Sequence, residues 1–385
     1  MKVYLTVLLA IFVLGQLGRI NLPGNEVALP LNDLAVGLVV LSGLITKRRL
    51  IKNWFYHPLF RALLVFAVAI VLSLFVNLPN LTIRQLAIAG LYPLRFFVYA
   101  GLYFVFKDGS REENIYLLKL FTIAILAVAI LGLLQYVFIP DVSFLAQWGW
   151  DDHYYRLVGT FLDPGFTGAI LALGLLMVFQ GQRVLNPGRF YYWPIMAVIY
   201  MALALTYSRA SYLMYLAAFA VIAFFKRSPK ILVVAALVIA VTIPLLPQST
   251  GEGTRLSREN SIYARIQNWQ QSLRIWTISP VLGVGFDAYR YTREKLNPEL
   301  SQSLAVSHAG AGADSSLLLV LATTGLVGFI CFLNLLRVMW LTGRNNLIFT
   351  AGLLAILIHS WFNNTLFYPW VMEWLWLMLA VRENI

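Results

Sequence analysis

The stretch LALTYSRASYLMYLAAF, residues 203–219, carries a single charged side chain, Arg209, at the point where two apolar runs meet. Apolar runs of about 18 residues can cross the hydrocarbon core of a bilayer as helices. A turn of only about two or three residues between them would leave the guanidinium little freedom to reach bulk water. We therefore interpret this stretch as a membrane hairpin with a functional arginine at its tip.

The composition extends this interpretation to the whole chain. Of its 385 residues, 60% are hydrophobic and 12% are charged, and the mean hydropathy is +0.76. The single cysteine, Cys331, lies inside an apolar run, which argues against a disulfide framework and a thiol-rich metal site. We expect an all-α polytopic membrane protein with about twelve transmembrane helices. The expected helices cover residues 3–18, 31–46, 59–77, 86–106, 115–138, 165–181, 190–207, 210–225, 230–247, 315–341, 346–362 and 368–381.

The charges of the connections predict an orientation. The short connections 46–54, 182–189 and 226–230 are basic, and the positive-inside rule places such segments on the cytoplasmic side. Residues 140–156 and 248–313 then lie on the outer side, and both termini are cytoplasmic. The net charge of +12 would suggest nucleic acid binding in a soluble protein, but this rule accounts for part of it, and we expect no nucleic acid partner.

The same pattern divides the chain into three parts. Residues 1–247 are expected to form the first nine helices, residues 248–313 a large extracytoplasmic loop, and residues 314–385 the last three helices. The first apolar segment follows a lysine, as in a signal peptide. It lacks a small-residue cleavage site, so we interpret it as the first membrane helix.

Arginine rather than lysine gathers on the predicted outer side, where Lys295 is the one lysine. The planar donor fork of arginine suits phosphate oxygens, so this excess favours a phosphorylated ligand. The alternative is ordinary: arginines at helix ends reach lipid head groups or pair with nearby acids. The outer arginines are Arg19, Arg84, Arg95, Arg156, Arg209, Arg255, Arg258, Arg265, Arg274, Arg290 and Arg293.

The loop 248–313 contains one strongly periodic segment. Apolar residues recur there at spacings of three and four, which predicts an amphipathic helix lying on the membrane surface and ending at Pro280. The periodic residues are Ile262, Ile266, Trp269, Leu273 and Trp276. After it, Gly283 and Gly285 allow a close approach of the backbone to another segment. A lone Gly-x-Gly on an outer loop does not indicate a nucleotide site.

Three titratable side chains follow the amphipathic segment. His308 lies in a Gly/Ala-rich loop and could be simply exposed, and Asp314 could act as a base or cap the next helix. His359 lies in the last turns of an apolar span, where it is either functional or a buried packing residue.

Four motifs, in order, resemble the O-antigen ligase and polymerase superfamily of lipid-linked glycan ligases and Wzy-type polymerases. The segment 155–174 resembles its Arg-x-x-Gly-Thr-Phe-x-x-Pro-Asn motif, with Gly165 in place of Asn. LTYSRASYL, residues 205–213, resembles its Thr-x-Ser-Arg motif, and 263–289 its Arg-x-x-x-Trp…Pro…Gly-x-Gly motif. The fourth motif begins with His in the ligases, but here Asp314 stands at that position. This favours a polymerase-like or divergent member.

The resemblance implies a GT-C-like fold and a metal-independent inverting glycosyltransferase without a cofactor. The donor would be a glycan on undecaprenyl or another polyprenyl pyrophosphate, at the outer face of a bacterial cytoplasmic (inner) membrane. The acceptor would be another lipid-linked glycan in a polymerase, or a lipid anchor in a ligase. Membrane lipids and a chain-length regulator are the other expected partners.

Roles for the candidate residues follow from this implied reaction. Arg209 and Arg265 would bind the pyrophosphate, with Arg156 and Arg95 as second choices, and Asp314 or His308 would be the base. His359, Trp269 and Ser208 are further candidates. The competing interpretations are a flippase or exporter of lipid-linked oligosaccharide and an inactive partner scaffold. Charges on one side and the lack of internal repeats favour the enzyme over the transporter.

Overall fold

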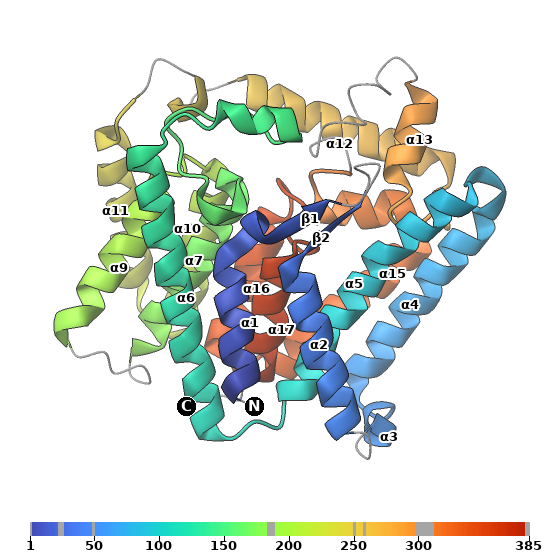
Figure 1. Cartoon of the computed structure of the whole chain (residues 1–385), viewed down its shortest axis with the longest axis horizontal. Coiled ribbons are helices and arrows are strands. Elements are labelled where there is room, and N and C mark those ends of the chain that lie inside the picture. Colours follow the sequence, from blue (N-terminus) through green and yellow to red (C-terminus); the bar gives the residue numbers. More distant parts are fainter. Residues whose placement is uncertain are drawn as a thin grey trace.

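The computed structural model describes residues 2–21, 27–47, 51–182, 189–248, 252–256, 259–297 and 312–381. Helices dominate this part of the chain (Figure 1). Each predicted apolar segment contains one, and the predicted amphipathic segment forms α12. The helices are α1 Lys2–Leu14, α2 Leu31–Thr46, α3 Ile51–Trp54, α4 Pro58–Val76, α5 Ile83–Phe106, α6 Arg111–Phe138, α7 Pro164–Gln180, α9 Arg189–Ala204, α10 Arg209–Phe225, α11 Pro229–Leu245, α12 Asn260–Ile278, α13 Tyr289–Leu296, α15 Ser316–Gly343, α16 Leu347–His359 and α17 Pro369–Ala380. A short antiparallel pair, β1 Arg19–Asn21 and β2 Ala28–Pro30, joins α1 to α2.

Four helices, α4, α5, α6 and α15, have the length and apolar composition needed to cross a membrane, and seven more apolar helices of 10–17 residues accompany them. The protein is therefore an all-α membrane protein. The number of spans, about twelve, stays a prediction.

The centre of the bundle is α17, in which all twelve residues are buried. It contacts α2, α5, α7 and α16. On the periphery, α4, α6 and α11 expose many Leu, Val and Ile side chains, as expected where helices face lipid tails. In Figure 1, α12 lies across one end of the bundle, and α1 begins and α17 ends at the opposite end. The α12 end is where the candidate residues gather.

A break in α15 fixes the segment that follows α12 onto the bundle. Gly325 has a φ of +63° inside this helix. Backbone hydrogen bonds of 2.9–3.2 Å join residues 280–285 to residues 322–327. A Cβ on Gly283 would clash with the backbone of Thr323, and a Cβ on Gly325 with that of Val281. The predicted close approach at Gly283 is thus confirmed, and its partner is the break in α15.

This close approach predicts a strong effect of one methyl group. Gly325→Ala should lower the thermal unfolding midpoint of the detergent-solubilised protein, because a left-handed non-glycine residue costs about 1–3 kcal/mol before any clash is counted. Gly90→Ala in α5 is the matched control, since a Cβ there meets nothing within 4 Å. Equal midpoints for the two variants would contradict the assigned role of Gly325.

Candidate functional site

The tip of the α9–α10 hairpin presents Arg209 as the first residue of α10. Ser208 caps this helix by accepting a 3.3 Å hydrogen bond from the backbone N–H of Ser211. The Arg209 side chain is half-buried. It donates to the backbone oxygen of Leu256 at 3.0 Å and to the hydroxyl of Ser261. Arg209 therefore faces the start of α12 instead of extending into the surroundings.

Arg156 lies beneath this tip and is buried. Its Nε donates to the backbone oxygen of Thr206 at 3.1 Å, and its Nη2 donates to that of Tyr207 at 3.5 Å. Tyr207 has a φ of +49°, so these contacts hold a strained turn. The contacts give Arg156 a structural role in presenting Arg209, and its direct part in binding pyrophosphate stays a prediction.

Arg265 and Trp269 lie one turn apart on α12 and both contact the connection between α16 and α17. The guanidinium of Arg265 lies 5.4 Å from the ring centroid of Phe362, and the indole N–H of Trp269 donates to the backbone oxygen of Trp361 at 3.1 Å. Burial lowers the pKa of Arg265, while the charges of Asp314 and Asp163 raise it and that of Arg209 lowers it further. Arg265 is thus electrostatically coupled to the other candidate charges.

Asp314 precedes α15 but does not cap it. Ser315 is the cap, since its hydroxyl accepts a 3.4 Å hydrogen bond from the backbone N–H of Leu318. The capping interpretation of Asp314 is therefore wrong. Its backbone N–H donates to the side-chain oxygen of Asn268 on α12 at 2.9 Å. Burial raises the pKa of Asp314 to about 6, and the charge of Arg265 opposes this rise. A carboxyl group with such a pKa suits a general base.

Asp163 joins this cluster although its sequence pattern did not indicate it. Its carboxylate caps α7 by accepting a 2.8 Å hydrogen bond from the backbone N–H of Phe166. Burial raises the pKa of Asp163, and its charge acts on both Arg265 and Asp314. An Asp-Pro pair at a helix start is typical of capping, so this pattern alone does not indicate a charge that acts on Arg265 and Asp314.

His359 is fully buried at the end of α16. Its Nδ1 lies 2.6 Å from the hydroxyl of Thr365, and its Nε2 lies 3.4 Å from that of Ser211. The Ser211 hydroxyl also donates to the backbone oxygen of Gly165 at 3.0 Å. These contacts join α16, α10 and α7, which favours the packing interpretation of His359. The other histidine candidate, His308, lies outside the described residues.

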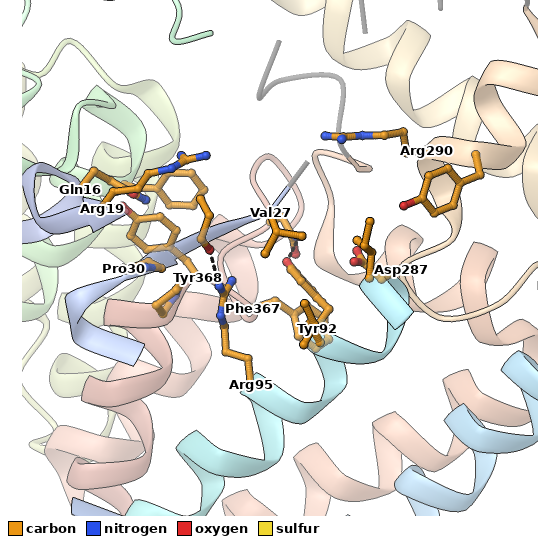
Figure 2. Close-up of a pocket in the computed structure, with 17 residues that line it drawn as sticks. Gln16, Arg19, Val27, Pro30, Tyr92, Arg95, Asp287, Arg290, Phe367 and Tyr368 are labelled. Carbon is orange, nitrogen blue, oxygen red and sulfur yellow. Dashed lines mark hydrogen bonds between the residues drawn. The ribbon is translucent and has the colours of Figure 1, made fainter. Parts of the chain in front are cut away.

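Arg95 belongs to a second cluster of charges. Its Nη2 lies 2.7 Å from the carboxylate of Asp33 and donates to the backbone oxygen of Ala28 at 3.3 Å. It lines a cavity of about 300 Å³ together with Arg19 and Arg290 (Figure 2). Among the described contacts of Arg95, none involves Arg209 or Arg265. Of the four proposed pyrophosphate ligands, Arg95 therefore lies in different surroundings from Arg209 and Arg265.

The two clusters lie on either side of one aromatic pair. Phe166, in the first turn of α7, stacks on Tyr368 with ring centroids 3.8 Å apart. Both rings line the cavity that holds Arg95. Asp163, three residues before Phe166, belongs to the cluster of Arg265 and Asp314. The pair therefore connects the wall of the cavity to the start of α7, which Asp163 caps.

The contacts of Arg156 predict a loss of stability when its charge is removed. Arg156→Gln should lower the free energy of unfolding by about 1.5–3 kcal/mol, the usual contribution of hydrogen bonds to a charged group. Thermal or chemical unfolding in detergent measures this change. Arg274→Gln on the exposed face of α12 is the control, and a variant at Arg156 that unfolds like this control would contradict the role.

Comparison with known proteins places these residues in a family context. No curated protein matches the chain. Residues 194–333 match a family model described as O-antigen ligase. This segment includes Arg209, Arg265 and Asp314. The resemblance expected from the sequence motifs is therefore confirmed over residues 194–333, where the chain matches this family model.

Proposed function

We propose that the protein is a membrane glycosyltransferase that transfers or polymerises a glycan from a polyprenyl-pyrophosphate donor at the outer face of a bacterial cytoplasmic membrane. The family match supports ligase- or polymerase-type activity. One observation carries the assignment to specific residues: α12, which bears Arg265, contacts Arg209 through the hydroxyl of Ser261 and the backbone N–H of Asp314 through the side chain of Asn268. Two cations and a base in one place are what such a transfer requires.

The reaction uses each group in a definite way. The acceptor hydroxyl attacks the anomeric carbon from the face opposite the pyrophosphate, so the configuration inverts. The bond between that carbon and the pyrophosphate oxygen breaks, and the negative charge that develops there is stabilised by Arg209 and Arg265. Asp314 takes the proton of the hydroxyl. The proposed reaction is metal-independent and requires no cofactor.

The present contacts of Arg209 are compatible with this role. It donates to an uncharged hydroxyl and a backbone oxygen, on Ser261 and Leu256. Hydrogen bonds to phosphate are stronger than hydrogen bonds to such neutral acceptors. We therefore expect the donor phosphates to replace the Ser261 contact.

The identity of the acceptor divides two versions of this function. A lipid-linked glycan acceptor defines a polymerase, with a chain-length regulator as a candidate partner, and a lipid anchor defines a ligase. Asp314, where the ligases have His, favours the polymerase. A lipid-linked oligosaccharide flippase is the competing class, and the gathering of Arg209, Arg265 and Asp314 at one end of the bundle argues against it. Transporters instead place their charged sites near the membrane midplane.

Reconstitution with a polyprenyl-pyrophosphate-linked oligosaccharide tests the function. We expect longer glycans together with released polyprenyl pyrophosphate, whereas a flippase would move the lipid across the bilayer without either product. Arg209→Ala and Arg265→Ala should each lower turnover by about 100-fold or more. Arg274→Gln, on the same helix as Arg265 but exposed, should leave it unchanged. Normal turnover in either alanine variant, with folding confirmed by its thermal midpoint, would exclude the assigned role.

The base can be tested through pH. Because burial raises the pKa of Asp314 to about 6, turnover should rise with pH through that value and level off above it, where the carboxylate is ionised. The charge of Arg293 lowers this pKa, so Arg293→Gln should move the midpoint of the profile to higher pH. Asp314→Asn should lower turnover by about 100-fold or more. A flat profile, or an active Asp314→Asn protein, would point to His308 instead.

A further inference from the structure

The cavity beside Arg95 is not used by the transfer described above. It opens between the end of α1, the start of α2, the middle of α5 and the start of α13. Figure 2 shows Gln16 and Arg19 on one side, Asp287 and Arg290 on the other, and Arg95 and Tyr92 between them. Its volume of about 300 Å³ matches the lower end of ligand pockets, which is about 300–1,000 Å³. It therefore suits a ligand no larger than one sugar residue.

A chain of polar contacts fixes Arg95 in this cavity. Its ion-pair partner Asp33 accepts a 2.8 Å hydrogen bond from the hydroxyl of Tyr99. The side-chain amide of Asn32 donates to that hydroxyl at 3.0 Å and to Glu373 at 2.8 Å. Glu373 is fully buried in α17. Burying acidic groups in an apolar bundle is unfavourable unless they are hydrogen-bonded or paired, and here these contacts hold the guanidinium of Arg95 beside the cavity.

The cavity is positively charged. Among the described residues that line it, three carry guanidinium groups, Arg19, Arg95 and Arg290, and one carries a carboxyl group, Asp287. Asp33 is occupied by Arg95 and Tyr99. The Nε and Nη1 groups of Arg95 and the guanidinium of Arg290 form no hydrogen bond among the described residues. Their N–H donors are suited to an oxyanion, which guanidinium groups bind with charge-assisted hydrogen bonds.

Asp287 adds a polar group of another kind. Its φ of +61° is a left-handed conformation that a non-glycine residue adopts at some cost and that is frequent at binding sites. Burial raises the pKa of Asp287 to about 7, with Arg290 and Arg95 opposing the rise. Its carboxyl group can therefore both accept and donate hydrogen bonds near neutral pH, as the hydroxyl groups of a sugar require.

The remaining walls are aromatic. Tyr92, Phe166, Phe367 and Tyr368 line the cavity, so apolar ring surface lies beside its charged groups, as in sites that hold the C–H face of a pyranose. A phosphate group alone would gain nothing from such walls. The combination of rings, a carboxyl group and guanidinium groups matches a sugar that itself carries an acid group.

We propose that this cavity binds a carboxylate-bearing sugar of the acceptor glycan, with Arg95 and Arg290 holding the carboxylate and the aromatic walls holding the ring. The assignment of this sugar to the acceptor rests on the proposed glycan transfer, but binding of the sugar does not depend on catalysis. The stacked pair of Phe166 and Tyr368 connects the cavity to Asp163, which belongs to the cluster of Arg265 and Asp314. An acceptor sugar held there lies next to the donor site.

Direct binding of small probes tests the cavity. The full chain in lipid nanodiscs is titrated with D-glucuronate, D-glucose and inorganic pyrophosphate, and binding is followed by ligand-observed NMR. We expect glucuronate to bind about tenfold or more tightly than glucose, as a charge-assisted contact predicts. Arg290→Gln should remove this preference, and Arg209→Gln and the exposed Arg274→Gln should preserve it. Arg290 lies on α13, in the segment between α12 and α15, so we expect the Arg290→Gln substitution to leave the membrane bundle intact.

Three results would overturn the proposal. Equal affinities for glucuronate and glucose show that no acid group is recognised, and an unchanged preference in Arg290→Gln shows that it is recognised elsewhere. If pyrophosphate displaces glucuronate from the unmodified protein but not from Arg290→Gln, the cavity binds phosphate, either from the donor or from a lipid head group. Binding without glycan transfer contradicts only the proposed function, and transfer without a preference for glucuronate contradicts only the cavity.

Discussion

The packing of residues 280–285 against the break in α15 is the constraint on which both charged clusters depend. Gly283 and Gly325 each adopt a positive φ and leave no room for a Cβ, so two backbones lie in direct contact. This contact holds the C-terminal end of α12, the helix that carries Arg265 near its start. It also holds the segment that leads to Asp287 and Arg290. The same α15 begins just after Asp314. One glycine-dependent joint therefore holds together α12 with Arg265, α13 with Arg290, and α15, which Asp314 precedes.

The fold stabilises these charged side chains by giving them hydrogen-bond and ion-pair partners. Arg156 donates hydrogen bonds to backbone oxygens of the turn before α10. This turn presents Arg209 to the start of α12. Arg95 is held by Asp33, which in turn is held by Tyr99. Supported guanidinium groups do not have to reorganise when a substrate anion arrives, and preorganisation is what makes such groups effective in a site with little water.

The sequence was sufficient for the helices and for the tip at Arg209, because apolar runs and tight turns are local features. It was also sufficient to expect a backbone contact at Gly283. It was not sufficient for partners that meet only in the fold. Asn32 and Glu373 are 341 residues apart and share a hydrogen bond, and the sequence pattern around Arg95 does not distinguish it from the other arginines predicted on the outer side. Asp314 and Ser315 compete for one capping position, and only geometry showed that Ser315 takes it.

The cavity would select its sugar mainly by rejecting neutral ones. A neutral sugar that fills it displaces water from the guanidinium group of Arg290 without offering a charged partner, whereas Arg95 keeps its ion pair with Asp33. Leaving a desolvated charge unpaired is more unfavourable than the gain from a well-paired one is favourable. The aromatic walls would hold either kind of sugar, so they supply affinity without discrimination. Discrimination therefore rests on the arginines, and it is sharpest where Asp33 and the chain to Glu373 prevent Arg95 from moving away.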